Sequence, residues 1–159
     1  MSVDSNRRTF LGSAASFMIV PRHALGGPGY VAPSDKITLA HIGVGTEGLR
    51  ELPPLLLSPE IQVVAVCDPN KYAGEYRDWS RDGIRNSMRR LLGKPDWTAG
   101  PGDPIPGGRD AAQNIVETYY ANARGADKYK GCAAYADFRE LLEKEKDINA
   151  VKVMTPDHL

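Results

Sequence analysis

A glycine-rich turn between two apolar segments is the part of this sequence whose residue types and spacing most directly suggest chemistry. Gly43, Gly45 and Gly48 form the pattern G-x-G-x-x-G directly after the β-branched segment 36–42. The first glycine suits a tight turn out of a strand, the second lets the backbone approach a pyrophosphate, and the third lets a helix pack closely on the strand. The N–H groups of that helix would point towards the phosphates. The segment therefore predicts a dinucleotide-binding loop formed by Gly43, Val44, Gly45, Thr46, Glu47 and Gly48.

An acidic residue stands where such a loop needs one. The apolar segment 61–67 is followed by Asp68, which lies 20 residues beyond Gly48. A carboxylate at this position accepts hydrogen bonds from the ribose hydroxyls of the adenosine half, and it repels a 2′-phosphate. A surface aspartate without a ligand is the alternative, but the glycine loop, the second strand and the acid occur together in the order that ribose binding requires. We therefore expect NAD as the cofactor in preference to NADP, although Lys71 nearby could soften that preference.

The elements that must position these residues predict an α/β fold. Four short apolar segments are typical of buried parallel strands, and they span residues 36–42, 61–67, 132–136 and 148–154. Helical patterns separate them, which predicts a Rossmann-type, doubly wound parallel sheet. Ligands bind to such sheets at the carboxyl ends of the strands, where we expect Gly43, Asp68 and Thr155 to meet.

Two of the expected helices carry local signals. Pro53 and Pro54 fall inside the first helix, which should end or kink near Leu52. Asp137 and Glu140 have the spacing of a capping box at the start of the last helix. The buried face of that last helix is expected to consist of Phe138, Leu141 and Leu142.

The stretch between Asp68 and the third strand is longer than a compact βαβ unit needs. We interpret residues 72–131 as an insert with helical patterns at 78–92 and 109–123. The Gly/Pro-rich residues 93–108 between them predict an ordered surface loop, for which a position over the site is one option.

Arginine recurs at every fourth position in the first helical pattern of the insert. On a helix these residues would form one stripe, which we interpret as a solvated face with local ion pairs to Asp78 and Asp82. An anion-binding face is the alternative. The stripe consists of Arg77, Arg81, Arg85 and Arg89.

Composition and isolated polar residues argue against several functions. Lys plus Arg and Asp plus Glu number 20 each, so the net charge is zero and no basic excess favours nucleic acid. Cys67 and Cys132 border apolar segments, and no C-x-x-C occurs. We interpret both as buried small residues, in preference to a disulfide or a reactive thiol, and expect no metal site. His41 is interpreted as a hydrogen-bonded strand residue, not as a catalyst.

The first 34 residues carry a targeting pattern. Arg7 and Arg8 precede the apolar stretch 11–20, which is too short to span a bilayer and suits a signal peptide. The order Arg-Arg-x-Phe-Leu resembles the bacterial twin-arginine signal, with a disordered basic tail as the alternative. We expect export, to the periplasm or beyond, no transmembrane span, and a Gly/Pro-rich linker that ends at residue 34. The dinucleotide-binding domain would occupy residues 35–159.

Four segments of this domain, in order, resemble the Gfo/Idh/MocA oxidoreductases, a family that acts mainly on sugars and cyclitols. They are residues 42–48, 64–69, 135–142 and 150–158. The resemblance implies an NAD(P)-binding Rossmann domain followed by a second α/β domain, absent from this chain, that holds the substrate. The catalytic lysine of the family lies one strand beyond the Thr-Pro pair. The resemblance therefore places no catalytic residue in this chain, which is expected to be truncated before that lysine and inactive alone.

The resemblance also adds expected contacts at the end of the chain. Thr155 and Pro156 would lie beside the nicotinamide, and His158 belongs to the same motif. For the complete enzyme it implies a sugar or related polyol substrate and a homo-oligomer. The long insert at 72–131 departs from the shorter spacing of the family.

Three functions stay open on these grounds. The first is the NAD(P)-binding part of an oxidoreductase that acts on sugars or related polyols by hydride transfer. The second is a non-catalytic nucleotide-binding or interaction module. The third is an S-adenosylmethionine-binding Rossmann domain, which also uses a glycine loop and an acid after the second strand. The final residues 155–158 favour the first.

Overall fold

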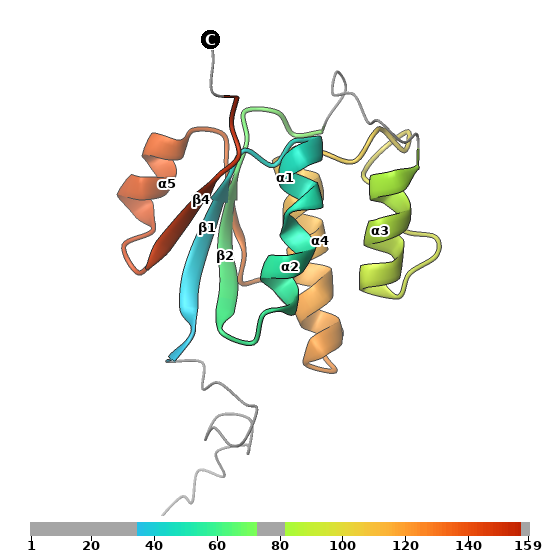
Figure 1. Cartoon of the computed structure of the whole chain (residues 1–159), viewed down its shortest axis with the longest axis horizontal. Coiled ribbons are helices and arrows are strands. Elements are labelled where there is room, and N and C mark those ends of the chain that lie inside the picture. The colour runs from blue at the N-terminus through green and yellow to red at the C-terminus, as the bar shows by residue number, and fades with distance from the viewer. Residues whose placement is uncertain (1–34, 73–81, 157–159) are drawn as a thin grey trace, which may run out of the picture.

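Four parallel strands form the centre of the computed structural model, which describes residues 35–72 and 82–156. The strands are β1 (Ile37–Ile42), β2 (Ile61–Cys67), β3 (Ala133–Tyr135) and β4 (Ala150–Val153). Their order across the sheet is β3-β2-β1-β4 (Figure 1). The first strand, β1, therefore lies inside the sheet. β2 and β3 follow in order on one side of it, and β4 lies on its other side. This α/β architecture confirms the predicted parallel sheet and is consistent with an incomplete Rossmann-like fold.

The pairing register brings the carboxyl ends of the strands together. Ile42 at the end of β1 lies opposite both Cys67 of β2 and Val153 of β4. Tyr135 at the end of β3 also pairs with Cys67. Any side chain that follows these four residues in the chain is therefore placed at one edge of the sheet.

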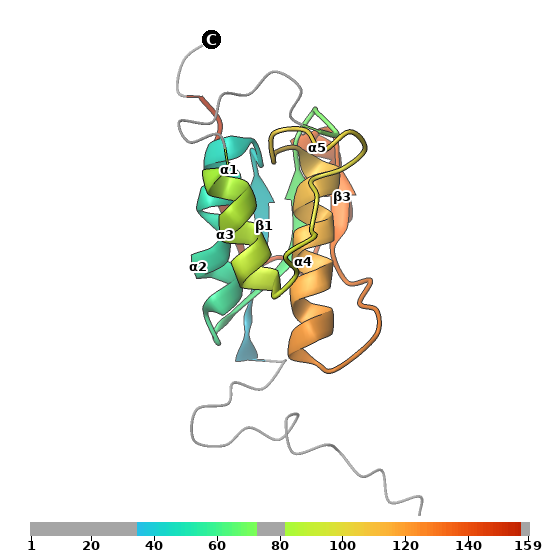
Figure 2. The same ribbon diagram turned by 90° about the vertical axis from the view of Figure 1, so that its right-hand side faces the viewer.

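Helices cover the two faces of the sheet unequally (Figures 1 and 2). One face carries α1 (Thr46–Arg50), α2 (Leu52–Leu57) and α4 (Arg109–Ala123), with α3 (Gly83–Leu92) packed on α1 and α4. Of the described residues, α5 (Phe138–Lys144) is the single helix on the other face. The larger core accordingly lies on the first face. A small core on the second face is formed by Leu141 against Ala40, Ile42, Ala65 and Cys67.

The first helical region breaks where its prolines predict. α1 ends at Arg50 and α2 begins at Leu52. Pro53 and Pro54 lie in the first turn of α2, where a missing N–H group costs no helical hydrogen bond. Leu52 and Leu56 are buried, so the break still leaves an apolar side against the sheet.

The long stretch before β3 consists of an ordinary crossover helix preceded by additional structure. α4 packs on both β2 and β3, as the helix of a β2–β3 crossover does. Its first residue is held at the end of β2, because Arg109 donates from its backbone N to Asn70 O and from Nη1 to Asp68 O, both at 3.0 Å. The predicted helix at 109–123 is confirmed. The extra part of the predicted insert therefore lies before α4, and residues 73–81 of it are outside the described residues.

The Gly/Pro-rich loop 93–108 packs against α3 and α4. Arg85 of α3 donates to the carbonyl oxygens of Asp103 and Pro104, and Trp97 of the loop donates to Asn114 of α4. The interpretation of the arginine stripe as solvated is wrong for Arg85, whose side chain is 12% exposed, although its predicted ion pair with Asp82 is confirmed. Arginines 77 and 81 lie outside the described residues.

α5 requires a correction of its predicted buried face. Leu141 is fully buried, but Phe138 is 43% and Leu142 45% exposed. No second helix of the described residues packs beside α5. Leu141, which packs against the sheet, is therefore buried, whereas Phe138 and Leu142 on either side of it are not. Asp137 caps the helix as predicted by accepting from Arg139 N at 2.8 Å, whereas Glu140 pairs with Lys144.

Part of the sequence predictions falls on residues that the structure leaves undescribed. The twin-arginine signal and the linker, residues 1–34, belong to this part, as does His158. Across the helices that are described, none has the length and apolar character needed to cross a membrane.

Candidate functional site

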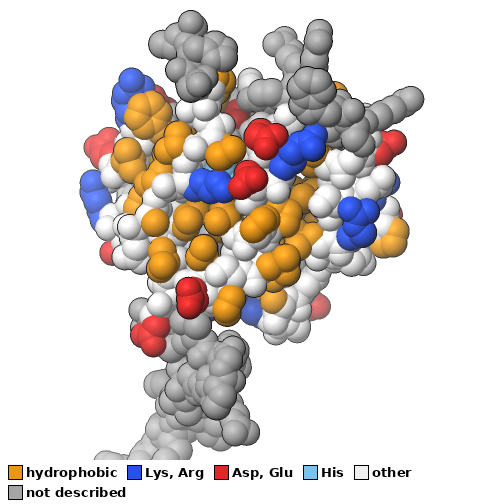
Figure 3. All heavy atoms as spheres, viewed as in Figure 1, with side chains coloured by type: hydrophobic (Ala, Val, Ile, Leu, Met, Phe, Trp, Pro, Cys, Tyr) orange, Lys and Arg blue, Asp and Glu red, His pale blue; other side chains and the backbone are white. Residues whose placement is uncertain are grey.

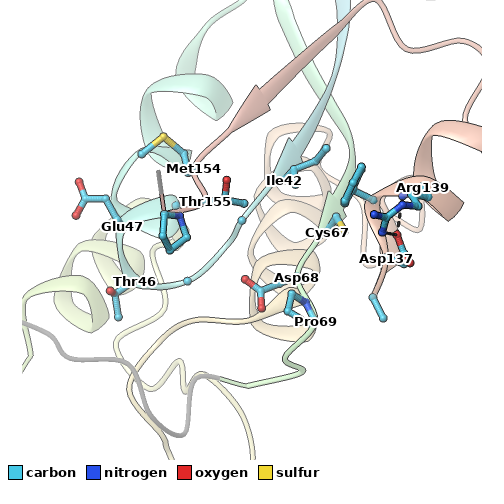
Figure 4. A pocket seen from close by; sticks show the side chains of 16 residues that line it. Ile42, Thr46, Glu47, Cys67, Asp68, Pro69, Asp137, Arg139, Met154 and Thr155 are labelled. Atoms are coloured by element: carbon cyan, nitrogen blue, oxygen red, sulfur yellow. Dashed lines mark hydrogen bonds and ion pairs between the residues drawn. The ribbon is translucent and has the colours of Figure 1, made fainter. Parts of the chain in front are cut away.

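A cleft of about 680 Å³ opens at the carboxyl ends of all four strands (Figure 4). Its lining comes from the segment after each strand: residues 42–48 apart from Val44, residues 67–69, 136–139 and 154–156. The predicted meeting of Gly43, Asp68 and Thr155 at this edge is thereby confirmed. The loop 93–108 contributes no lining residue, so it does not cover the cleft.

The glycine loop, residues 43–48, is held between β2 and β4 at a place where a side chain cannot fit. Gly43 has a φ of +83°, and a Cβ atom added there would lie 2.6 Å from Met154 O. Its N–H donates to Cys67 O at 2.8 Å. Gly43 is thus required both by its left-handed backbone and by the closeness of the neighbouring strand end.

Gly48 is required by the contact between the loop and α1. A Cβ atom on Gly48 would lie 2.0 Å from Gly43 O. The absence of a side chain lets α1 sit directly on the turn, which is the role predicted for the third glycine. Gly45 is the N-cap residue of α1, and Thr46 and Glu47 form its first turn, all three lining the cleft.

Val44 differs from the rest of the loop because its side chain is fully buried in the core. Its backbone groups serve the protein: the N–H donates to Asp68 Oδ2 at 3.0 Å, and the carbonyl accepts from Gly108 N at 2.7 Å. The Val44 side chain therefore does not reach the cleft. The residue anchors the loop to β2 and to the start of α4.

Asp68 is 2% exposed and points into the cleft between the glycine loop and α5 (Figure 4). Oδ2 accepts from Val44 N and Oδ1 accepts from Asn70 N at 2.9 Å. The hydrogen bond to Val44 holds the acid and the loop in a fixed relation.

The end of β4 supplies the opposite wall of the cleft. Met154 N donates to Ile42 O at 2.8 Å, which continues the strand pairing one residue beyond β4. Thr155 and Pro156 follow it, are exposed, and line the cleft. The structure therefore brings nine of the ten predicted cofactor residues to this edge, and the tenth, His158, lies outside the described residues.

The start of α5 also belongs to the site, although its sequence predicted only a helix cap and a buried face. Residues 136–139 line the cleft and include Asp137 and Arg139. Their position directly after the third strand was the signal that could have placed them there, because strand ends of a parallel sheet share one edge. The lining thus contains three carboxylates, those of Glu47, Asp68 and Asp137, and one cation, Arg139.

His41 is buried outside the cleft, and its expected hydrogen bond is missing. Neither ring nitrogen has a hydrogen-bond partner in the part of the chain that the structure describes. Burial, together with the nearby Lys152 cation, lowers the pKa of His41 to about 4. Lys152 itself is paired with Glu51 at 2.7 Å. The imidazole is therefore neutral at pH 7, and the interpretation of His41 as a hydrogen-bonded residue is wrong.

Both cysteines are buried free thiols, which confirms the interpretation of the sequence. Cys67 borders the cleft, but burial is the main cause that raises its thiol pKa. Burial likewise raises the pKa of Cys132. Neither thiol is activated as a nucleophile. Within residues 35–72 and 82–156, no group of three His, Cys, Asp or Glu residues is arranged to hold a metal ion.

Comparison of the chain with models of protein families, with curated proteins and with solved structures finds no match.

Proposed function

We propose that this chain binds NAD in the cleft and forms the nucleotide-binding part of an oxidoreductase that acts on sugars or related polyols. The observation that carries the proposal is the convergence of the glycine loop, Asp68 and Thr155 on one cleft at the carboxyl ends of β1, β2 and β4.

The order of the strands supports an extended dinucleotide. Across the sheet the order is β4, β1, β2, β3. The nicotinamide would lie at Thr155 and Pro156, the pyrophosphate at the glycine loop, and the adenosine ribose at Asp68. A linear ligand whose parts are joined in that sequence can meet all three positions without folding back.

Hydrogen bonds within the protein hold the loop and the acid in one arrangement. Asp68 holds Val44 N, and Gly108 N holds Val44 O, so the turn is fixed from both sides. Pre-ordering of this kind lowers the entropy cost of binding. The three carboxylates in the lining also disfavour an additional 2′-phosphate, which supports NAD over NADP.

When bound, NAD supplies the hydride acceptor at nicotinamide C4. The chain's own residues would bind and orient the cofactor. The proton of a substrate hydroxyl requires a base, which the proposed enzyme would take from its substrate domain.

Titration calorimetry of the chain with NAD, NADP and S-adenosylmethionine tests the proposal. We expect NAD to bind more tightly than NADP and S-adenosylmethionine to show no binding. Gly45→Val should abolish NAD binding by placing a branched side chain where the pyrophosphate approaches, while circular dichroism shows the fold retained. Tighter NADP binding would refute the role of Asp68. Binding of S-adenosylmethionine without NAD would replace the proposal by the methyl-donor alternative.

A further inference from the structure

The cleft has a wall that the proposed function leaves unassigned, at the carboxyl end of β3. Residues 136–139 form it, and β3 borders β2 on the side away from β1. With the pyrophosphate at the glycine loop and the ribose at Asp68, the base on that ribose extends away from β1, towards this wall. Figure 4 shows Asp137 and Arg139 on the far side of Asp68 from Thr46 of the loop.

Asp137 uses one carboxylate oxygen for the helix and presents the other to solvent or ligand. Oδ1 accepts from Arg139 N at 2.8 Å and lies 3.6 Å from Arg139 Nη1. In the described residues, Oδ2 accepts no hydrogen bond, and the side chain is 53% exposed. An ionised carboxylate accepts hydrogen bonds and donates none. The group that it can recognise is therefore a donor.

Arg139 and Phe138 place a flat, polarisable surface beside this acceptor. The Arg139 guanidinium lies over the Phe138 ring at 4.6 Å from its centroid. Planar guanidinium groups and aromatic rings stack on nucleobases, and such stacking tolerates every base because each has a π-face. Discrimination between bases must then come from hydrogen bonds to the edge of the base, and Asp137 is the acceptor placed to make one.

We propose that Asp137 selects the base of the dinucleotide by accepting, at Oδ2, a hydrogen bond from the exocyclic amine of adenine. Arg139 supplies the stacking surface. Hypoxanthine and guanine carry a carbonyl oxygen at the position of that amine, which would set an acceptor against an acceptor. The inference rests on the proposed function, since it takes the ribose to lie at Asp68.

The test compares NAD with nicotinamide hypoxanthine dinucleotide, which carries a carbonyl oxygen in place of the exocyclic amine, with the accompanying hydrogen on N1, and has the same charge. The wild-type chain should bind NAD about tenfold more tightly, a modest factor because Asp137 is half exposed.

Asp137→Asn is the informative variant because asparagine still caps a helix through its oxygen. Its amide nitrogen replaces Oδ2 and donates instead of accepting, so the preference for NAD should vanish or reverse. A residue that merely capped α5 would leave this preference unchanged. Arg139→Ala should weaken the binding of both dinucleotides by a similar factor. Glu143→Gln removes a negative charge from the same helix outside the cleft, and it should keep the wild-type preference.

The outcomes separate the two proposals. Equal binding of both dinucleotides by the wild type, or an unchanged preference in Asp137→Asn, would overturn the role of Asp137 while leaving the proposed function in place. Failure of the wild type to bind either dinucleotide would overturn the proposed function and this inference with it.

Discussion

Two glycines of the loop are required by interatomic distances. A Cβ atom on Gly43 or Gly48 would approach a backbone carbonyl, which cannot rotate away as a side chain can. Gly93, by contrast, has a positive φ of 62° but open space around it. Substitution by alanine should therefore distinguish a glycine that is required by close packing from one that is required only by its left-handed backbone.

We predict that Gly48→Ala lowers the free energy of unfolding by about 1–3 kcal/mol and disrupts NAD binding, because the new methyl group forces α1 away from the turn. Gly93→Ala should lower the free energy of unfolding by about 1 kcal/mol, because alanine is less stable than glycine in the left-handed conformation, and it should leave NAD binding intact. Urea denaturation and NAD titration of both variants check the prediction. Equal midpoints and equal affinities would mean that α1 does not rest on the loop.

His41 makes stability depend on pH in a defined window. Its pKa is 6.5 in the unfolded chain and about 4 when folded, because burial and Lys152 disfavour the charged ring, while Glu51 opposes them weakly. Above pH 6.5 both states are neutral and His41 has no effect. As the pH falls from 6.5 to 4, the unfolded chain takes up a proton that the folded chain does not, and the folded state loses up to about 3 kcal/mol.

His41→Leu should remove this loss, since leucine neither titrates nor leaves ring nitrogens unsatisfied. Urea unfolding of wild type and variant at pH 7.0, 5.5 and 4.5 measures the difference. The two curves of stability against pH should diverge below pH 6.5, with the variant the more stable. Parallel curves would contradict the burial of a neutral imidazole at this position.

Among the elements, α3 and the loop 93–108 are joined by arginine side chains: Arg89 donates to Trp97 O, and Arg85 makes several contacts. Arg85 contacts both Asp82 at the start of α3 and Asp103 of the loop, which has a left-handed φ of 48°. Its guanidinium also donates to the Asp103 and Pro104 carbonyl oxygens. The conformation of a loop rich in glycine and proline thus depends on hydrogen bonds from a helix.

Arg85→Ala should therefore release the loop. We expect faster amide hydrogen exchange in residues 93–106 and a cost of about 1–2 kcal/mol, since several hydrogen bonds to one charged group are lost. Arg90→Ala, at an exposed position of the same helix, serves as the control and should change stability by less than about 0.5 kcal/mol. Unchanged amide hydrogen exchange in Arg85→Ala would show that the conformation of the loop does not depend on Arg85.

At the scale of the whole molecule, the sheet has an apolar edge. Of the described residues, no strand pairs with β4 on its outer side, and Val151 and Val153 are 40% and 59% exposed. Phe138 and Leu142 of α5 are also exposed. Figure 3 shows hydrophobic side chains gathered over the region of β4 and its neighbours. An unpaired strand edge with apolar side chains favours association.

We predict concentration-dependent self-association of the 159-residue chain, measurable by sedimentation velocity. Val153→Lys should reduce it, because a charged side chain at a strand edge opposes pairing. Leu57→Lys is the matched control: Leu57 is 63% exposed on α2, and its replacement should leave association unchanged. A monomer at all concentrations, or equal effects of both variants, would exclude the β4 edge as the contact.

Local signals in the sequence determined the strands, the glycine loop, the break before Pro53 and the cap at Asp137. Each depends on the conformational preferences of residues next to one another in the chain, so spacing alone carries the information. The same is true of Asp68, whose place after a strand defines its position in a parallel sheet.

Tertiary structure decided which side chains are covered and which of them share a site. Within the described residues, Phe138 is exposed because no second helix lies beside α5. His41 finds no hydrogen-bond partner there, because Lys152 opposite it on β4 is paired with Glu51 and Val66 opposite it on β2 is apolar. α4 is the crossover helix because it packs on β2 and β3. Asp137 joined the cleft because β3 lies beside β2. These outcomes depend on contacts between residues that are distant in the chain, and the energies of such contacts are set by packing that no local pattern encodes.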